Sequence, residues 1–307
     1  MNDVVAALDC GSNSTRLLIV DGANETIRRE MNITRLSQGV DESGTLRGEA
    51  MRRTFDVLRE YRMYMDEAAV ERGLLVATSA VRDAHNGEEF LSGARDITGV
   101  DVRILDGNEE ATFSYVGATA GLAEDARSTV IVDVGGGSTE LAVKIDGVLK
   151  SYSMQLGCVR VTERALGSGV VSAQSDTAAR AMIAAELDRA WAAVPDFATI
   201  SGDVRLVGLA GSVSTLAQLD AGLAVYDRDA VHHRVLSLET VALWRDRLSA
   251  EPPKARLARP GMVRGREDVL HAGLYVLAAV MERLGAEELL ASENDILDGI
   301  TESLLHR

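Results

Sequence analysis

The stretch Asp9-Cys-Gly-Ser-Asn-Ser-Thr-Arg-Leu17 occurs a second time in the chain as Asp133-Val-Gly-Gly-Gly-Ser-Thr-Glu-Leu141. The two stretches align without a gap and share Asp, Gly, Ser, Thr and Leu. An apolar run precedes each stretch and another follows its turn, so each copy predicts a strand, a glycine-containing turn and a second strand. This repeat predicts a duplicated domain whose equivalent turns face each other across a pseudo-twofold cleft.

In the rest of the chain, segments whose apolar residues have the spacing of a helix alternate with segments that have the spacing of a strand. Helices are predicted at 49–71, 109–120, 173–194, 214–220, 267–284 and 296–305, and further strands at 74–77, 102–105 and 204–209. Three of the four prolines fall in 252–265, which predicts an irregular loop. Strand hairpins that alternate with helices indicate an α/β fold with mixed sheets.

Composition excludes several classes of protein. The 307 residues contain 32 Lys and Arg against 47 Asp and Glu, a net charge of −15, which argues against nucleic-acid binding and against an anionic membrane surface. The run 269–281 is too short to span a membrane, and the N-terminus lacks a secretion signal. The two cysteines, Cys10 and Cys158, predict neither a disulfide framework nor a zinc site. We expect a cytoplasmic protein.

The two glycine-containing turns are candidate phosphate sites, because glycine lets consecutive backbone N–H groups approach an anion closely. One such turn alone would be interpreted as an ordinary hairpin turn, and neither is a Walker A loop. The duplication favours phosphate binding. The candidate residues are Gly11, Ser12, Asn13, Ser14, Gly135, Gly136, Gly137, Ser138 and Thr139.

Carboxylates lie at or near these turns. Asp9, Asp133 and Glu140 could hold Mg²⁺ directly or through water, or they could be turn-capping and exposed strand residues. Glu109 and Glu110 open a predicted helix that Asn108 could cap, and the residues alone favour this structural role.

Cationic and helix-terminal groups provide further candidates. Arg82 could bind phosphate or form a surface ion pair, and Gly211-Ser212 could form an anion site or a simple connection. The segment 254–266 contains no acid, and its cations could hold phosphates beyond the scissile one or form a solvated surface. These cations are Lys254, Arg256, Arg259, Arg264 and Arg266.

With these residues in view, the sequence resembles the exopolyphosphatase and guanosine pentaphosphate phosphohydrolase (Ppx/GppA) family, within the actin, sugar kinase and heat-shock chaperone superfamily. The resemblance depends on six short motifs in the family's order. Besides the two repeats, they are Ala77-Thr-Ser-Ala-Val-Arg-Asp-Ala84, Asp106-Gly-Asn-Glu-Glu-Ala111, Leu156-Gly-Cys-Val-Arg160 and Arg266-Glu-Asp-Val269.

This resemblance implies two ribonuclease-H-like domains around a central cleft. The first would comprise residues 1–124 with 293–307 and be closed by the C-terminal helix, and the second would comprise residues 125–292. The chain is similar to the short actinobacterial exopolyphosphatases, which lack the helical C-terminal domain of longer members. Processive action on long chains is therefore not expected, whereas a homodimer is possible.

The resemblance also assigns roles to residues. Glu110 matches the catalytic base, while Asp133 and Glu140 match residues assigned to Mg²⁺, with Mn²⁺ as an alternative, or to positioning the attacking water. Arg82 and the two turns match phosphate contacts. The family's usual Gly-Thr before the late helix is Gly211-Ser212 in this sequence.

The leading hypothesis is a Mg²⁺-dependent exopolyphosphatase that removes the terminal phosphate of inorganic polyphosphate, preferably from short chains. The alternatives are a guanosine pentaphosphate 5′-phosphohydrolase, a non-catalytic phosphate or nucleotide sensor, and an ATP-dependent kinase. Aromatic residues make up only 4% of the chain, and a nucleotide base would need a stacking surface, so the composition favours polyphosphate.

Overall fold

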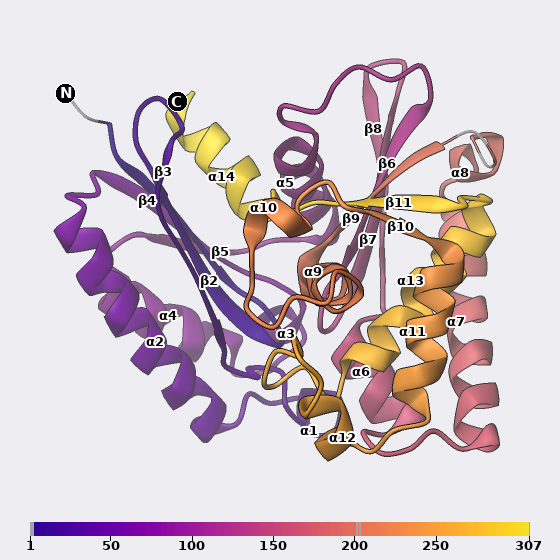
Figure 1. Cartoon of the computed structure of the whole chain (residues 1–307). Coiled ribbons are helices and arrows are strands. Elements are labelled where there is room, and N and C mark those ends of the chain that lie inside the picture. The colour runs from indigo at the N-terminus through magenta and orange to yellow at the C-terminus, as the bar shows by residue number, and fades with distance from the viewer. Residues whose placement is uncertain (1–2, 201, 203, 307) are drawn as a thin grey trace. The chain divides into compact units, whose positions relative to one another are not determined.

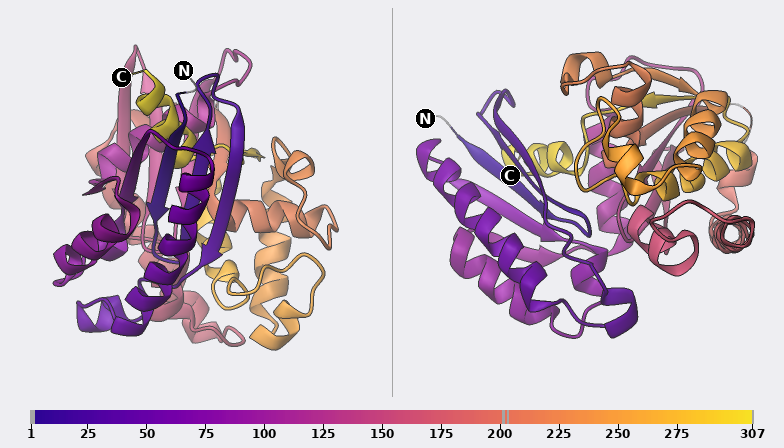
Figure 2. Two further views of the ribbon diagram at one scale, coloured as in Figure 1. Left: turned by 90° about the vertical axis from the view of Figure 1, so that its left-hand side faces the viewer. Right: turned by 60° about the horizontal axis from the view of Figure 1, so that its bottom comes forward.

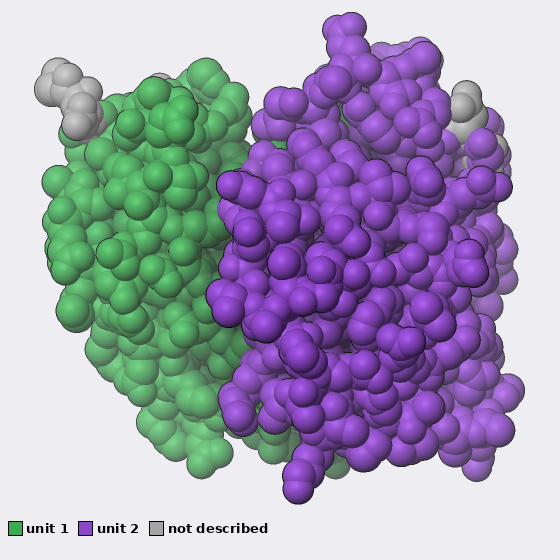
Figure 3. Space-filling model, viewed as in Figure 1, with its two compact units in different colours: residues 1–117, 296–307 green, residues 118–295 purple. Residues whose placement is uncertain are grey.

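The computed structural model describes residues 3–200, 202 and 204–306 (Figure 1). The chain divides into two compact units, residues 1–117 with 296–307 and residues 118–295 (Figure 3). The first is called unit 1 and the second unit 2. The domain boundaries expected from the sequence stay a prediction.

Unit 1 contains a five-stranded sheet in the order β3-β2-β1-β4-β5. Strand β2 runs antiparallel to β1 and β3, whereas β4 is parallel to both β1 and β5. The strands are β1 (Val5–Cys10), β2 (Ser14–Val20), β3 (Thr26–Ile33), β4 (Arg72–Ala77) and β5 (Asp101–Ile104). The helices are α1 (Val40–Ser43), α2 (Gly48–Glu67), α3 (Ser79–Arg82), α4 (Gly87–Thr98), α5 (Gly107–Thr119) and α14 (Ile296–Leu305).

The two faces of this sheet are covered by different helices. Because successive strand residues point to opposite faces, Ala6 and Leu8 of β1 belong to the core that includes α2 and α4. Val5 and Ala7 belong to the core that includes α14. The helix pair α2 and α4 thus lies on one side of the sheet and α14 on the other (Figure 2).

Unit 2 contains a six-stranded sheet in the order β10-β11-β9-β6-β7-β8. Its strands are β6 (Ser128–Val134), β7 (Thr139–Ile145), β8 (Val148–Met154), β9 (Val204–Leu209), β10 (Val235–Ser237) and β11 (Glu288–Ala291). Its helices are α6 (Cys158–Val161), the π-helix η1 (Thr162–Leu166), α7 (Ala173–Ala193), α8 (Asp196–Thr199), α9 (Ala210–Asp220), α10 (Arg228–Val231), α11 (Leu238–Ser249), α12 (Pro253–Leu257) and α13 (Leu270–Leu284).

The two sheets share one plan. In each, three consecutive strands form an antiparallel meander, and two later strands extend the sheet parallel to the first, as β4 and β5 do in unit 1 and β9 and β11 in unit 2. This is the ribonuclease-H-like arrangement, with β10 added at one edge of unit 2. The α/β prediction with two related sheets is confirmed. The repeat extends to a third strand, β3 in unit 1 and β8 in unit 2, which was not predicted from the sequence.

The segment predicted as an irregular loop is partly helical, because α12 begins with Pro253 at a position where a proline needs no hydrogen-bond donor. None of the helices in the described part of the chain combines the length and the apolar character that a membrane span requires.

Candidate active site

The β1–β2 turn of unit 1 is held from one side by the segment after β3. Gly11 N donates to Ser14 O at 3.0 Å, Ser37 N donates to Ser12 O, and the N–H groups of Thr34 and Arg35 donate to Asn13 O. In a trans peptide the C=O and the N–H point in opposite directions. The Asn13 N–H therefore points away from the supporting segment, as an anion site requires.

Polar side chains of this turn are buried. Ser12 Oγ lies 3.1 Å from Ser79 Oγ, so the turn contacts the start of α3, the short helix that ends at Arg82. Asn13 is 6% exposed, and its side-chain nitrogen Nδ2 has no hydrogen-bond partner in the described part of the chain. A buried donor without a partner is costly, and a phosphate oxygen would satisfy it.

Asp9 faces Arg16 across the β1–β2 ladder. Arg16 donates from Nε and Nη2 to Asp9 Oδ2 at 3.0 and 2.6 Å. This guanidinium neutralises the carboxylate and occupies its Oδ2 atom. The role of Asp9 as a metal ligand stays a prediction, which this ion pair disfavours.

The start of α5 separates the roles of its two glutamates. Asp106, not Asn108, caps the helix: its Oδ1 accepts from the N–H groups of Asn108 and Glu109, and Glu109 Oε2 accepts from Asp106 N. Glu109 is thus committed to the cap. Glu110, the next residue, is buried, at 8% exposure.

Arg82 lies beside Glu110. Its Nη1 donates to Leu105 O at 2.8 Å and lies 3.5 Å from Glu110 Oε2. The arginine side chain retains 24% of its exposure, so it can still meet an anion, while the Leu105 carbonyl fixes its direction. Unit 1 therefore brings a cation, a buried carboxylate and the donors of the first turn together through α3 and α5.

The β6–β7 turn of unit 2 repeats the first turn. Gly135 N donates to Ser138 O at 3.1 Å, as Gly11 does to Ser14. The first N–H groups of α6 donate to the carbonyls of Gly135 and Gly136, so the N–H groups of Gly136 and Gly137 point away from α6. Neither of these two N–H groups donates a hydrogen bond to another backbone group among the described residues.

The short motif around Gly157 is required for this support. A Cβ atom at Gly157 would lie 2.2 Å from Gly136 O, so only glycine lets α6 approach the turn. Thr139, a predicted substrate contact, is fully buried and donates to Leu156 O at 2.6 Å. Its hydroxyl therefore fixes the loop that leads into α6.

The charges behind the second turn differ from those behind the first. Asp133 faces Glu140 across the β6–β7 ladder, at the positions that Asp9 and Arg16 occupy in unit 1. Both carboxylates are buried, at 7% and 1% exposure, and Ser153 Oγ donates to Glu140 Oε1 at 2.7 Å. Like charges directly opposite each other destabilise a sheet, so this pair favours a bound cation.

The donor set fits Mg²⁺ or Mn²⁺, since both prefer carboxylate and water oxygens and Mg²⁺ commonly uses only one or two carboxylates. No group of three or more His, Cys, Asp or Glu side chains with metal-binding geometry occurs in the described ranges. Ser153 and Ser79 contact Glu140 and Ser12 respectively, and neither was among the site residues predicted from the sequence. A third strand in the predicted repeat would have pointed to Ser153.

Gly211 and Ser212 lie at the start of α9 together with Arg266. A Cβ atom at Gly211 would lie 1.8 Å from the Arg266 guanidinium, so this cation packs directly against the glycine backbone. Arg266 is 8% exposed. Burial raises the pKa of the nearby Cys158 thiol, and the Arg266 charge partly opposes this effect. These positions form a compact cationic corner of unit 2.

The other predicted arginines have structural partners. Arg256 has no exposed surface and donates to the carbonyls of Leu248 and Gly169, both at 2.7 Å. A contact between Arg256 and polyphosphate does not fit this geometry, because the guanidinium is enclosed. Arg259 donates from Nε to Glu251 at 2.8 Å, an acid just outside the acid-free segment, and this pair lowers the pKa of Glu251.

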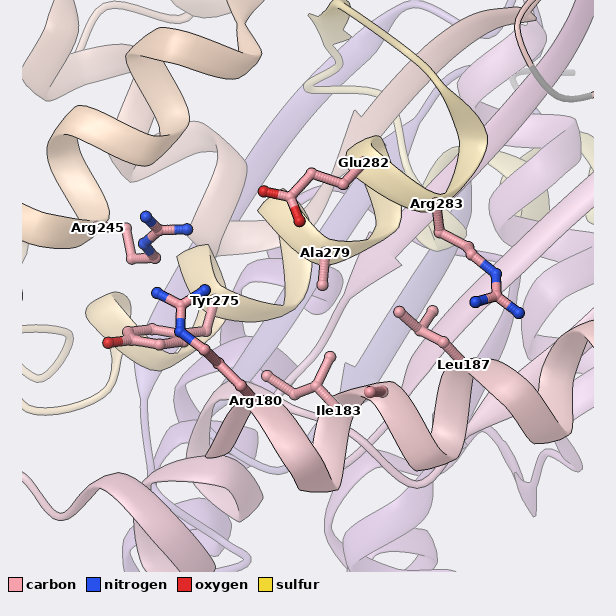
Figure 4. A pocket seen from close by; sticks show the side chains of 9 residues that line it. Arg180, Ile183, Leu187, Arg245, Tyr275, Ala279, Glu282 and Arg283 are labelled. Carbon is pink, nitrogen blue, oxygen red and sulfur yellow. The ribbon is translucent and has the colours of Figure 1, made fainter. Parts of the chain in front are cut away.

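A pocket of about 400 Å³ between helices of unit 2 contains none of the predicted site residues (Figure 4). Its floor is apolar, and each of its arginines is paired with an acid, so its lining provides little net positive charge. The pairs are Arg180–Asp176, Arg245–Asp246 and Arg283–Asp188.

The chain is similar to known proteins over almost its whole length. The model of the Ppx/GppA phosphatase family matches residues 18–307. Exopolyphosphatase 2 of Mycobacterium tuberculosis is 38% identical over 317 aligned positions, which cover 98% of each chain.

Solved structures extend the comparison. An exopolyphosphatase-like protein has a TM-score of 0.92 and 33% identity, with 99% of both chains covered. An exopolyphosphatase from Cytophaga hutchinsonii has a TM-score of 0.87 and 25% identity, with 99% of this chain and 98% of that chain covered. The fold, the duplicated turns and these matches agree, and the chain belongs to the Ppx/GppA phosphatase family.

Proposed function

We propose that this protein is an exopolyphosphatase that hydrolyses the terminal phosphoanhydride bond of inorganic polyphosphate. The observation that carries the proposal is the buried Asp133–Glu140 pair behind a turn with outward-pointing N–H groups. Membership of the family and the 38% identity to a protein named Exopolyphosphatase 2 support it. Polyphosphate carries the repeated anionic oxygens that such turns can bind.

Glu110 is proposed as the general base. The oxygen of an attacking water forms a bond to the terminal phosphorus, the bridging P–O bond breaks, and Glu110 accepts a proton of the water. The products are phosphate and a chain shortened by one unit. Arg82, 3.5 Å from Glu110, binds an oxygen of the phosphoryl group and holds the carboxylate in place.

The turns offset the charge of the substrate. The N–H groups of Asn13, Gly136 and Gly137 are fixed by the hydrogen bonds of their neighbouring carbonyls, so they need no reorganisation when charge develops on phosphate oxygens. Arg266 is proposed as a further phosphate contact from the start of α9. Asp9, Thr139, Arg256 and Arg259 are not included, because their polar groups have structural partners.

Mg²⁺, with Mn²⁺ as an alternative, is proposed as the cofactor held by Asp133 and Glu140. When bound it would neutralise phosphate oxygens and lower the charge repulsion that an attacking water meets.

The test is to incubate the protein separately with triphosphate, long-chain polyphosphate and guanosine pentaphosphate, and to measure phosphate release with and without Mg²⁺. We expect Mg²⁺-dependent release from polyphosphate, with the shorter chain preferred. Faster turnover of the nucleotide would assign the alternative activity, and tight binding without release under any divalent metal would assign a sensor. Glu110→Gln is the control for contaminating phosphatases.

A further inference from the structure

Arg256 is a fully buried cation that no role in the proposed reaction explains. It lies in α12, and its guanidinium is enclosed by main-chain carbonyls from distant parts of unit 2. It donates to the carbonyls of Leu248 at 2.7 Å, Gly169 at 2.7 Å, Ser168 at 3.1 Å and Glu267 at 3.1 Å. Burial of a charged guanidinium costs a large desolvation energy, which the hydrogen bonds offset only when the surrounding carbonyls keep a well-defined arrangement. The network therefore favours one arrangement of these loops.

His271 completes this network. Arg256 Nη1 lies 3.0 Å from His271 Nδ1, and because a guanidinium can only donate, Nδ1 must be the acceptor. His271 Nε2 therefore carries the proton and donates to Gly167 O at 3.0 Å. Burial, with the nearby Arg256 charge, lowers the pKa of His271 to about 3, so the ring stays neutral in its accepting form.

The segment between these two residues contains Arg266. The carbonyl of Glu267, the next residue after Arg266, accepts from Arg256, and Leu270 N donates to Arg266 O at 2.8 Å as α13 begins. After α12 ends, the path to α13 consists of turns, one bend and two residues without assigned structure. Arg256 and His271 thus tie both ends of an otherwise irregular path.

The end point of this path is closely constrained. The Arg266 guanidinium lies against the backbone of Gly211, where a Cβ atom would lie within 1.9 Å of three guanidinium atoms. A small shift of the Glu267 backbone would therefore move the cation off the start of α9. Turn hydrogen bonds such as that from Arg266 N to Val263 O hold the path locally, and the contacts of Arg256 and His271 fix its two ends.

We infer that Arg256 is a positioning residue that holds Arg266 in place and thereby sets the affinity of the protein for polyphosphate. This inference rests on the proposed function, and in particular on Arg266 as a phosphate contact. It replaces the expectation that Arg256 itself binds the chain.

A double-mutant cycle tests it. KM and kcat for polyphosphate are measured for the wild type, Arg256→Lys, Arg266→Gln and the double variant. We expect Arg256→Lys to raise KM by about 5- to 20-fold with kcat within about 3-fold, and to raise KM by less than about 2-fold when Arg266 is already Gln. Effects that multiply in the double variant would overturn the inference, because a general loss of structure does not require Arg266.

His271 provides a second cycle if Arg256→Lys fails to fold. His271→Asn keeps an acceptor for Arg256 and should retain the wild-type KM, whereas His271→Leu removes the acceptor and should raise KM only while Arg266 is present. Equal KM values for these two variants would also overturn the inference. Arg247→Lys is the matched control, because Arg247 is an exposed arginine next to Leu248.

These experiments distinguish failure of the positioning role from failure of the proposed function. If the wild type released no phosphate from polyphosphate, the proposed function would fail. If the wild type were active and Arg266→Gln left KM unchanged, the positioning role would fail alone.

Discussion

Lowering the pH from 7 to 5 should weaken the folding of unit 2 through His271. Burial, and then the Arg256 charge, lowers the pKa of this histidine from 6.5 to about 3. An unfolded chain would bind a proton at His271 below pH 6.5, while the folded chain would not until about pH 3. The contribution of His271 to the free energy of unfolding is therefore fully present above pH 6.5 and is lost progressively as the pH falls toward 3.

The magnitude follows from linkage. Each pH unit between the two pKa values changes the free energy of unfolding by about 1.4 kcal/mol, and pH 5 lies roughly 1.5 units below the unfolded value. His271 alone should thus reduce the free energy of unfolding by about 2 kcal/mol between pH 7 and pH 5. That is a large part of the total for an ordinary domain.

The assay is urea unfolding followed by tryptophan fluorescence. The chain has two tryptophans, Trp191 in α7 and Trp244 in α11, and both belong to unit 2, so the signal reports on the unit that contains His271. The comparison is with His271→Asn, which cannot titrate. The other ionisable groups are unchanged, so their contributions cancel when the two pH dependences are subtracted.

We expect the difference between the wild type and His271→Asn to shrink by about 2 kcal/mol from pH 7 to pH 5. If the two proteins lost the same stability over this range, the histidine would not be held neutral. The reasoning about its tautomer and its hydrogen bond from Arg256 would then be refuted.

Three further outcomes are expected. Glu110→Gln should lower kcat on polyphosphate by about 10²- to 10⁴-fold with KM within a few-fold, because the amide cannot accept the proton of water, and an unchanged kcat would remove Glu110 from the mechanism. In Mg²⁺ titrations of activity, Asp133→Asn should raise the Mg²⁺ concentration needed for the half-maximal rate. Asp9→Asn should leave this concentration unchanged, because Asp9 is already neutralised by its ion pair with Arg16. Equal shifts for the two variants would contradict this assignment. Gly157→Ala should lower the free energy of unfolding of unit 2 by roughly 2–3 kcal/mol or more, because the added Cβ meets the backbone of the turn. Gly169→Ala is the control and should be close to neutral, because the space around its Cβ is open. Urea unfolding followed by tryptophan fluorescence of both variants tests this, and equal effects would contradict it.

The repeated hairpins could be predicted from the sequence because each combines a local turn signal with flanking apolar runs. Strand β3 could not, because Thr26–Ile33 contains three charged residues and lies at the sheet edge, where half-exposed positions blur the alternation. Strands β10 and β11 are too short, at three and four residues, to show a period.

The candidate site could be predicted in part. When the two repeats are aligned, Arg16 of the first copy corresponds to Glu140 of the second. This is the one aligned position at which the charge of the side chain reverses. Its meaning depends on the strand register, which pairs these residues with Asp9 and Asp133. The environment of Arg256 was not predictable, because the carbonyls at Ser168 and Gly169 that enclose it lie 88 and 87 positions away in the sequence.

The path of the chain between the units has a consequence for biosynthesis. Unit 2 is inserted within unit 1, since residues 118–295 separate the main part of unit 1 from α14. Helix α14 covers the sheet face that includes Val5, Ala7 and Leu18. At ~5–20 residues per second, a ribosome needs roughly 10 to 40 s to translate the intervening 178 residues (295 − 118 + 1). Throughout that time the apolar face lacks its cover, so the unit that begins the chain is the last to complete its fold, and the nascent protein would benefit from a chaperone at that surface.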